Sequence, residues 1–209
     1  MGTKVVFVLF YTLSFFIQTM AEWFPGQEVP LVKSEARDRI SRALAYVLGT
    51  KEYGRVTVVD LVNASGVSRS TFYRCFQSID DVVIYQYSRM IEEVLNRGLP
   101  TVGPPEQRVE EFSSTIANVA WKYREVLSVF NMCGLTPRII DAGKKMVKDA
   151  GMSDERAFGA MYQVAGVAGW LVVWLDDGVH GTEEDLRKRL VTLLTYGHTS
   201  PNLLKRGYQ

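Results

Sequence analysis

The amino-acid sequence predicts an all-α protein. Apolar residues recur at helical spacing in every long segment of the 209-residue chain, and capping and helix-breaking residues separate those segments. No segment alternates apolar and polar residues as a half-buried strand would. The composition, 47% hydrophobic and 22% charged, is that of a globular protein with a sizeable core. We expect four helices, a joint rich in helix breakers and about four more helices.

Residues 1–30 precede the first predicted helix and form a leader and linker. Lys4 is followed by the apolar run Val5–Ile17 and then by small residues, as in a secretory signal. The run is shorter than the about 20 apolar residues of a membrane span. Three interpretations stay open: export or membrane tethering, an added strand or helix on the body of the protein, and a translated leader whose working start is Met20 rather than Met1. We favour the last two, because the rest of the sequence indicates an intracellular protein without membrane contact.

The first predicted helix begins near Ser34, after the helix breakers of the linker. Its apolar residues follow the spacing of one buried helical face: Ile40, Ala43, Leu44, Val47 and Leu48. Gly49 and Gly54 bracket the break that follows.

Two short helices joined by a tight turn come next. Thr57 is a candidate N-cap for the first, and the turn contains Gly66, which can adopt positive φ. Ser68 is a candidate N-cap for the second, which ends near Phe76. This order is the helix-turn-helix pattern, whose second helix enters the major groove of DNA.

The second of these helices carries side chains suited to DNA. Arginine can pair with guanine edges or phosphates, and hydroxyl groups can hold phosphate or sugar oxygens. The helix N-terminus at Thr57 also offers N–H groups to a phosphate. The candidate DNA-binding residues are Thr57, Ser68, Arg69, Ser70, Thr71, Tyr73 and Arg74. We assign Val67, Phe72 and Phe76 to packing among the helices instead.

A fourth helix runs from here to the clearest boundary in the chain. Ser78 and Asp81 are spaced like a capping box at its start, and its apolar stripe ends at Leu95. The breaker-rich segment Gly98–Pro105 then separates two parts. We predict a helix-turn-helix DNA-binding domain at residues 31–97 and a second helical domain at residues 105–200.

Helical patterns also fill the second domain. Apolar residues repeat at helical spacing from Val109 to Phe130, and a polar helix is expected over residues 137–150. Residues 157–175 are apolar except for Gln163, so this helix must be buried all round or lie in a membrane. We favour burial against a partner, because charged residues follow at once and the glycines would weaken an isolated helix. Thr182 and Asp185 cap a last amphipathic helix.

The segment Thr57–Val82 resembles the DNA-binding domain of the TetR (tetracycline-repressor, AcrR-like) family of transcriptional regulators. Its sequence is TVVDLVNASGVSRSTFYRCFQSIDDV. The similarity extends back to Arg37 and is strong over this part of the chain, whereas the C-terminal part is similar only loosely. The resemblance implies phosphate contacts from Thr57 and Tyr73, and base or backbone contacts from Ser68 to Thr71 and from Arg74.

Three positions depart from the family pattern. Ile79 stands where the family usually has a lysine that contacts a phosphate. Cys75 replaces a usual aromatic residue or histidine, and Glu52 stands where glycine is common. The first departure predicts weaker and less salt-sensitive DNA binding. None of the three breaks the motif.

The resemblance also implies a regulatory and dimerisation role for the second domain. Its last two helices would pair with those of a second copy, and the homodimer would present two recognition helices to a palindromic operator. Aromatic side chains in this domain could line a cavity for a small-molecule effector. The candidate pocket residues are Trp121, Phe130, Tyr162, Gln163 and Trp170. The simpler interpretation is that each aromatic residue belongs to the core.

Charge and side-chain chemistry narrow the function further. The net charge is +1, but the range Lys33–Ser78 holds eight basic and four acidic residues, 8 − 4 = +4, which leaves −3 for the rest. This distribution suits a phosphate-binding module joined to a domain of another kind. Two cysteines and two histidines without ligand spacing predict no metal site, and no nucleophile–base pair or phosphate loop is present. We expect neither an enzyme nor a cofactor.

The sequence thus predicts a cytoplasmic, nucleoid-associated transcriptional regulator. We expect a homodimeric repressor whose operator binding responds to an unidentified signal. A second hypothesis is a protein-binding co-regulator of the same fold that has lost DNA or ligand binding, and Ile79 favours it.

Overall fold

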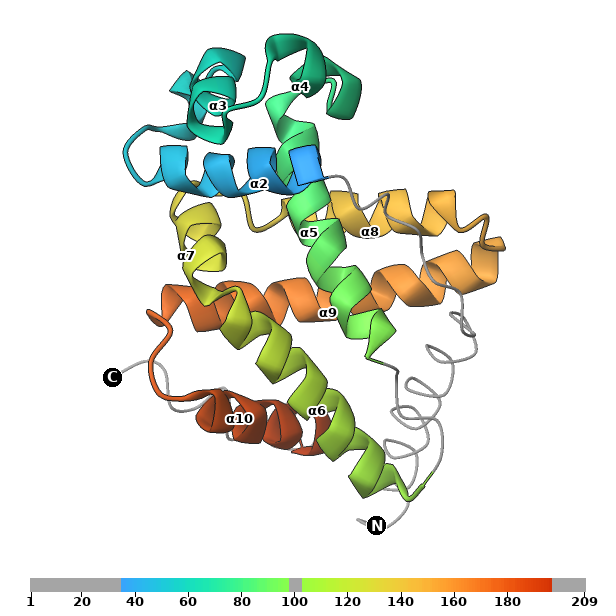
Figure 1. Cartoon of the computed structure of the whole chain (residues 1–209). Helices are drawn as coiled ribbons and strands as arrows, with labels where there is room; N and C mark the ends of the chain where they lie inside the picture. The colour runs from blue at the N-terminus through green and yellow to red at the C-terminus, as the bar shows by residue number, and fades with distance from the viewer. Residues whose placement is uncertain (1–34, 98–102, 197–209) are drawn as a thin grey trace. The chain divides into compact units, whose positions relative to one another are not determined.

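The computed structural model of the chain describes residues 35–97 and 103–196, apart from the side chains of Pro105, Gln163 and Tyr196. The leader at residues 1–30 lies outside these ranges, as do residues 98–102 of the predicted boundary. Within them every regular element is a helix and no strand is present (Figure 1). The predicted all-α fold is therefore confirmed.

Nine α-helices and one short 3-10 helix make up the described part of the chain. In chain order they are α2 (Glu35–Leu48), η1 (Tyr53–Arg55), α3 (Val58–Ser65), α4 (Arg69–Cys75), α5 (Ile79–Asn96), α6 (Pro105–Lys122), α7 (Arg124–Met132), α8 (Arg138–Asp149), α9 (Asp154–Asp176) and α10 (Glu183–Tyr196).

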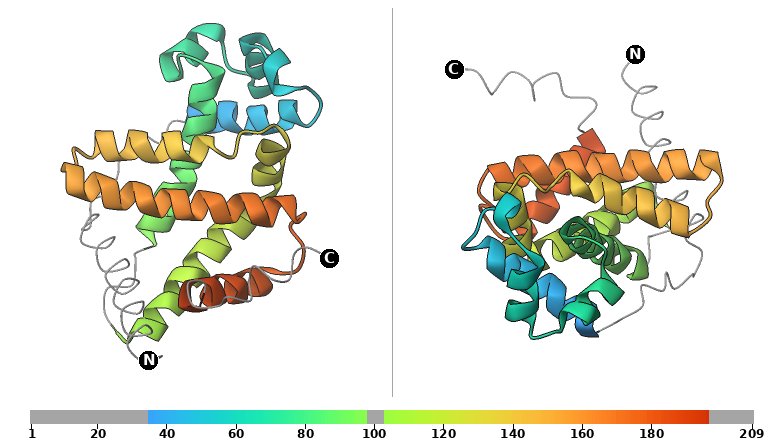
Figure 2. Two further views of the ribbon diagram at one scale, coloured as in Figure 1. Left: turned by 180° about the vertical axis from the view of Figure 1, so that it is seen from behind. Right: turned by 90° about the horizontal axis from the view of Figure 1, so that it is seen from above.

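The chain divides into two compact units, and the larger contains α2 to α4, most of α5, and α7 to α9. In this unit α2 packs against α3, α4 and α7, and α8 lies along α9, as both views of Figure 2 show. The apolar face predicted for α2 is buried, because none of its five residues is more than 7% exposed. Tyr87 and Phe130 are fully buried, and their rings meet edge to face at 5.6 Å.

The smaller unit contains α6 and α10, which pack against each other. Its buried apolar residues include Phe112 and Ile116 on α6 and Leu186 and Leu190 on α10. Polar contacts bind the same two helices together: the Arg187 guanidinium pairs with Glu110, and Asn118 Nδ2 donates to Glu183 Oε1 at 2.9 Å. The cap predicted at the start of α10 is present, because Asp185 N donates to Thr182 Oγ1 at 3.2 Å.

One expected helix is two helices in the structure. The apolar pattern from Val109 to Phe130 predicts a continuous helix, but α6 ends at Lys122 and α7 begins at Arg124. Tyr123 between them has ψ near 9°, and its hydroxyl donates to Glu93 Oε2 at 2.9 Å. The break carries no glycine or proline signal, so helical spacing continues across it in the sequence.

Among the described residues, the apolar helix α9 is packed on one side only. Ala160, Ala168, Leu171, Trp174 and Leu175 are buried. On the other side Phe158, Tyr162 and Val173 are 79%, 65% and 69% exposed. By length and composition α9 is also the one helix in the described ranges that could cross a membrane.

Candidate nucleic-acid interface

The start of α3 is held by a complete capping box. Asp60 N donates to Thr57 Oγ1 at 3.3 Å, and Thr57 N donates back to Asp60 Oδ2 at 2.7 Å. Lys51 Nζ also donates to Asp60 Oδ2, at 2.6 Å. The donors to this carboxylate, Lys51 first and then Thr57, lower the pKa of the Asp60 carboxyl to about 2. The Thr57 hydroxyl is engaged in the cap, so first-turn N–H groups are what the helix end offers to a phosphate.

The turn between α3 and α4 depends on a glycine. Gly66 has φ of 67°, which favours glycine over residues with a Cβ. A Cβ at this position would lie 2.8 Å from Arg39 Nη2, which donates to Ser65 O at 2.6 Å. The guanidinium of α2 therefore occupies the space beside the turn, and glycine leaves it free.

Hydroxyl groups cluster at the start of α4, the predicted recognition helix. The predicted N-cap is confirmed, since Thr71 N donates to Ser68 Oγ at 3.1 Å. Ser68 Oγ also lies 2.8 Å from Ser70 Oγ and 3.0 Å from Thr71 Oγ1. All of these contacts are solvent-exposed. They bring together three of the candidate DNA-binding residues.

Apolar residues in α4 and next to its two ends face the interior of the unit. Phe72 is fully buried and Phe76 is 5% exposed, while Val67 is half-buried. The Phe76 ring lies 5.5 Å from the Tyr85 ring of α5, edge to face. Packing of these rings fixes the rotation of α4 about its axis.

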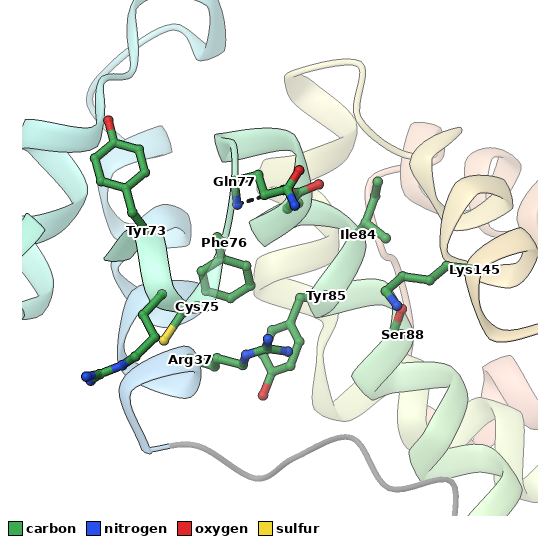
Figure 3. A pocket seen from close by; sticks show the side chains of 11 residues that line it. Arg37, Tyr73, Cys75, Phe76, Gln77, Ile84, Tyr85, Ser88 and Lys145 are labelled. Carbon is green, nitrogen blue, oxygen red and sulfur yellow. Dashed lines mark hydrogen bonds between the residues drawn. The ribbon is translucent and has the colours of Figure 1, made fainter. Parts of the chain in front are cut away.

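The rotation that buries these rings exposes the remaining candidates. Arg69, Ser70 and Arg74 are exposed, and Tyr73 is 60% exposed. Figure 3 shows the Tyr73 hydroxyl directed away from Phe76 and Tyr85. One face of α4 therefore carries cationic and hydroxyl groups, and the opposite face anchors the helix.

The start of α5 combines the predicted cap with contacts that sequence reasoning missed. Asp81 N donates to Ser78 Oγ at 3.1 Å, as predicted. Next to it, Tyr53 Oη donates to Asp80 Oδ1 at 2.5 Å, and Arg138 of α8 pairs with the same carboxylate at 3.2 Å. Burial and the hydrogen bond raise the pKa of Tyr53. The three groups come from segments that are far apart in the sequence, so residue spacing does not predict their contacts.

The five candidate pocket residues lie in different environments. Phe130 is fully buried against Tyr87, whereas Tyr162 is exposed. Trp170 is half-buried and stacks on Trp174 with ring centroids 5.8 Å apart. Trp121 belongs to the smaller unit, and the side chain of Gln163 lies outside the described set. In the described ranges no group of three or more His, Cys, Asp or Glu could hold a metal ion.

A buried anchor face, an exposed polar face and a glycine turn between two capped helices define a helix-turn-helix protein. No family model matches the chain, and no curated protein matches its sequence. Solved structures do match the chain, and they identify its fold.

Three solved structures share the arrangement of helices at low identity. A putative TetR-family transcriptional regulator from Syntrophomonas wolfei is 14% identical, with a TM-score of 0.54 over 80% of this chain and 96% of that chain. The transcriptional regulator FadR from Bacillus subtilis, solved with stearoyl-CoA, is 14% identical, with a TM-score of 0.53 over 77% and 98%. The fatty acid degradation regulator FadR from Bacillus halodurans is 18% identical, with a TM-score of 0.51 over 80% and 98%. The chain has the fold of the TetR-family transcriptional regulators.

Proposed function

We propose that the protein is a homodimeric transcriptional repressor that binds a palindromic operator. The observation that carries the proposal is the division of α4 into a buried anchor face and an exposed face of cationic and hydroxyl groups. The exposed face holds Arg69, Ser70, Tyr73 and Arg74, and Thr57 caps the helix that precedes it. In this role the protein acts in the cytoplasm, on the nucleoid, as a binding protein and not as an enzyme.

The exposed stripe on α9 supports the dimer. Phe158, Tyr162 and Val173 are spaced to share one helical face, and Gly166 lies between them. A Cβ at Gly166 would meet nothing within 4 Å among the described residues. A second copy of α9 would cover the exposed side chains, and the small residues permit close approach. A dimer places two recognition helices on two half-sites of an operator.

An effector is part of the proposal. The FadR structure from Bacillus subtilis was solved with stearoyl-CoA, so this fold can hold a small molecule. We propose that a signal of this general kind changes the affinity for DNA. The helices that carry Phe130 and Trp170 would hold it.

The test is DNA binding by the full chain, measured by fluorescence anisotropy with DNA from upstream of its own gene. We expect the double variant Arg69→Ala, Tyr73→Ala to bind at least about tenfold more weakly, because a base or phosphate contact contributes about 1–3 kcal/mol. Lys148→Ala is the matched control, since Lys148 is exposed on α8 and is not part of the helix-turn-helix. Equal affinity of the wild type and the double variant would refute the assigned residues.

The rival function is a protein-binding co-regulator that does not bind DNA. Ile79 favours it, since a half-buried isoleucine begins α5 where the resemblance implies a phosphate-contacting lysine. The same titration at several salt concentrations separates the two functions. DNA binding that weakens as the salt concentration rises supports the regulator. Negligible affinity at every salt concentration, together with capture of a protein partner, supports the co-regulator.

A further inference from the structure

A pocket of about 460 Å³ lies within the larger unit, between α2, α4, α5 and α8. Its volume is in the usual range of small-molecule sites. None of the five pocket residues predicted from the sequence lines it. Figure 3 shows the side chains around it. The pocket is thus a separate feature of the fold, next to the C-terminal half of α4.

The side chains around the pocket give it a positive charge. Three basic residues, Arg37, Arg74 and Lys145, and one acidic residue, Asp81, line it. Asp81 Oδ2 already accepts the N–H groups of Gln77 and Ser78, at 2.9 and 3.0 Å. Its charge is therefore offset by the backbone at the start of α5. The remaining charge favours an anion.

The Arg37 guanidinium is bound by aromatic rings and not by a carboxylate. It lies 5.4 Å from the centroid of Phe76 and 5.7 Å from that of Tyr85. Among the described residues nothing accepts a hydrogen bond from it or pairs with it as an acid. Ring contact holds the cation in place and leaves its N–H donors for a ligand.

A buried hydroxyl provides a second polar group. Ser88 is 2% exposed, lines the pocket, and its Oγ has no hydrogen-bond partner in the described part of the chain. A buried hydroxyl without a partner is costly, so its presence calls for one. In Figure 3 the Lys145 side chain runs from α8 toward Ser88. Lys145 pairs with Asp149 on its own helix, an exposed contact that a bound anion could replace.

We propose that this pocket binds a small organic anion, with a carboxylate or phosphate group on an apolar body. The oxyanion would lie between the Lys145 ammonium and the Ser88 hydroxyl, with Arg37 adding charge. Ile84 and the aromatic rings would contact the apolar body. The site joins the end of the recognition helix to α8, so an occupant contacts both.

The test titrates benzoate, phenyl phosphate and the neutral benzamide into the full chain without DNA, followed by ligand-observed NMR. We expect at least one anion to bind saturably and benzamide to bind at least about tenfold more weakly. Lys145→Gln and Ser88→Ala should each weaken the anion about tenfold, because each removes one charged or charge-assisted contact. Lys148→Gln, on the same helix but outside the pocket, should leave it unchanged.

The preferred anion identifies the source, carboxylate or phosphate ester. The proposal is overturned if neither anion saturates, if benzamide binds equally well, or if Lys145→Gln and Lys148→Gln behave alike. Lys145 is exposed, so its variant folds even if Ser88→Ala does not. DNA is absent from the anion titration, so a negative result there does not contradict the proposed function. Likewise, a failure to bind DNA would not contradict the proposed anion site.

Discussion

Asp60 connects three parts of the chain through one carboxylate. It closes the capping box with Thr57 and accepts a hydrogen bond from the ammonium group of Lys51, in the loop before α3. The sequence predicts the Thr57 cap from residue type and position. Sequence spacing does not predict the Lys51 contact, because that contact depends on the path of the chain around η1. The carboxylate therefore holds the loop to the helix end that is proposed to face DNA.

The bonds to Asp60 make folding stability depend on acid. The pKa of its carboxyl is about 2 in the folded chain against an ordinary value of 3.8. The folded state therefore binds fewer protons between these values, and stability falls as pH drops through that window. We expect Asp60→Asn to flatten the fall in stability between about pH 4 and about pH 2, measured by urea unfolding.

Thr57→Val provides the matched control for this prediction. It removes one donor to Asp60 but leaves Lys51 and the backbone N–H in place. Its acid dependence should lie between those of the wild type and Asp60→Asn. An unchanged slope in Asp60→Asn would show that other carboxyl groups determine the acid response.

At the level of helices, periodicity and capping predict most of what the structure shows. Each N-cap that the sequence predicts is present, because capping depends on local residues. The four capping residues are Thr57, Ser68, Ser78 and Thr182. The break at Tyr123 could not be predicted, since the hydroxyl contact to Glu93 is tertiary. The pocket near α4 could not be predicted either, because its polar groups come from four helices that only the tertiary fold brings together.

The packing of α8 on α9 depends on Gly143, whose missing side chain leaves room for Val164. A Cβ on Gly143 would lie 2.9 Å from Val164 Cγ1 and 3.0 Å from Cγ2. Overpacking of this kind costs about 1–3 kcal/mol, partly offset by the about 1 kcal/mol that alanine gains over glycine in a helix. We expect Gly143→Ala to lower the free energy of unfolding by about 1 kcal/mol in urea titrations.

A double-mutant cycle isolates the cause of that loss. In a Val164→Ala background the clashing methyl groups are absent, so Gly143→Ala should be neutral or stabilising. If Gly143→Ala lowers the free energy of unfolding equally in both backgrounds, a clash with Val164 is not the cause of the loss.

At the scale of the whole molecule, the exposed side of α9 is the feature that a single chain does not account for. The sequence predicts a helix buried all round, and the part of the chain that the structure describes buries only one of its sides. The prediction and the structure agree if a second copy covers the other side. Residue type could indicate that α9 needs a partner, but which side chains remain for the partner depends on how α7 and α8 pack against it.

Val173 tests that second copy directly, because it is 69% exposed at the C-terminal end of the stripe. A glutamate there would cost nothing in a monomer but would bury an unpaired charge in the dimer, which weakens association by about tenfold or more. We expect Val173→Glu to shift the protein to monomer in sedimentation velocity at concentrations where the wild type is dimeric. Met132→Glu is the matched control, since Met132 is 78% exposed but lies on α7. If both variants sediment like the wild type, the dimer interface lies elsewhere. If Val173→Glu alone becomes monomeric, affinity for a two-half-site operator should fall with it, while affinity for a single half-site should not.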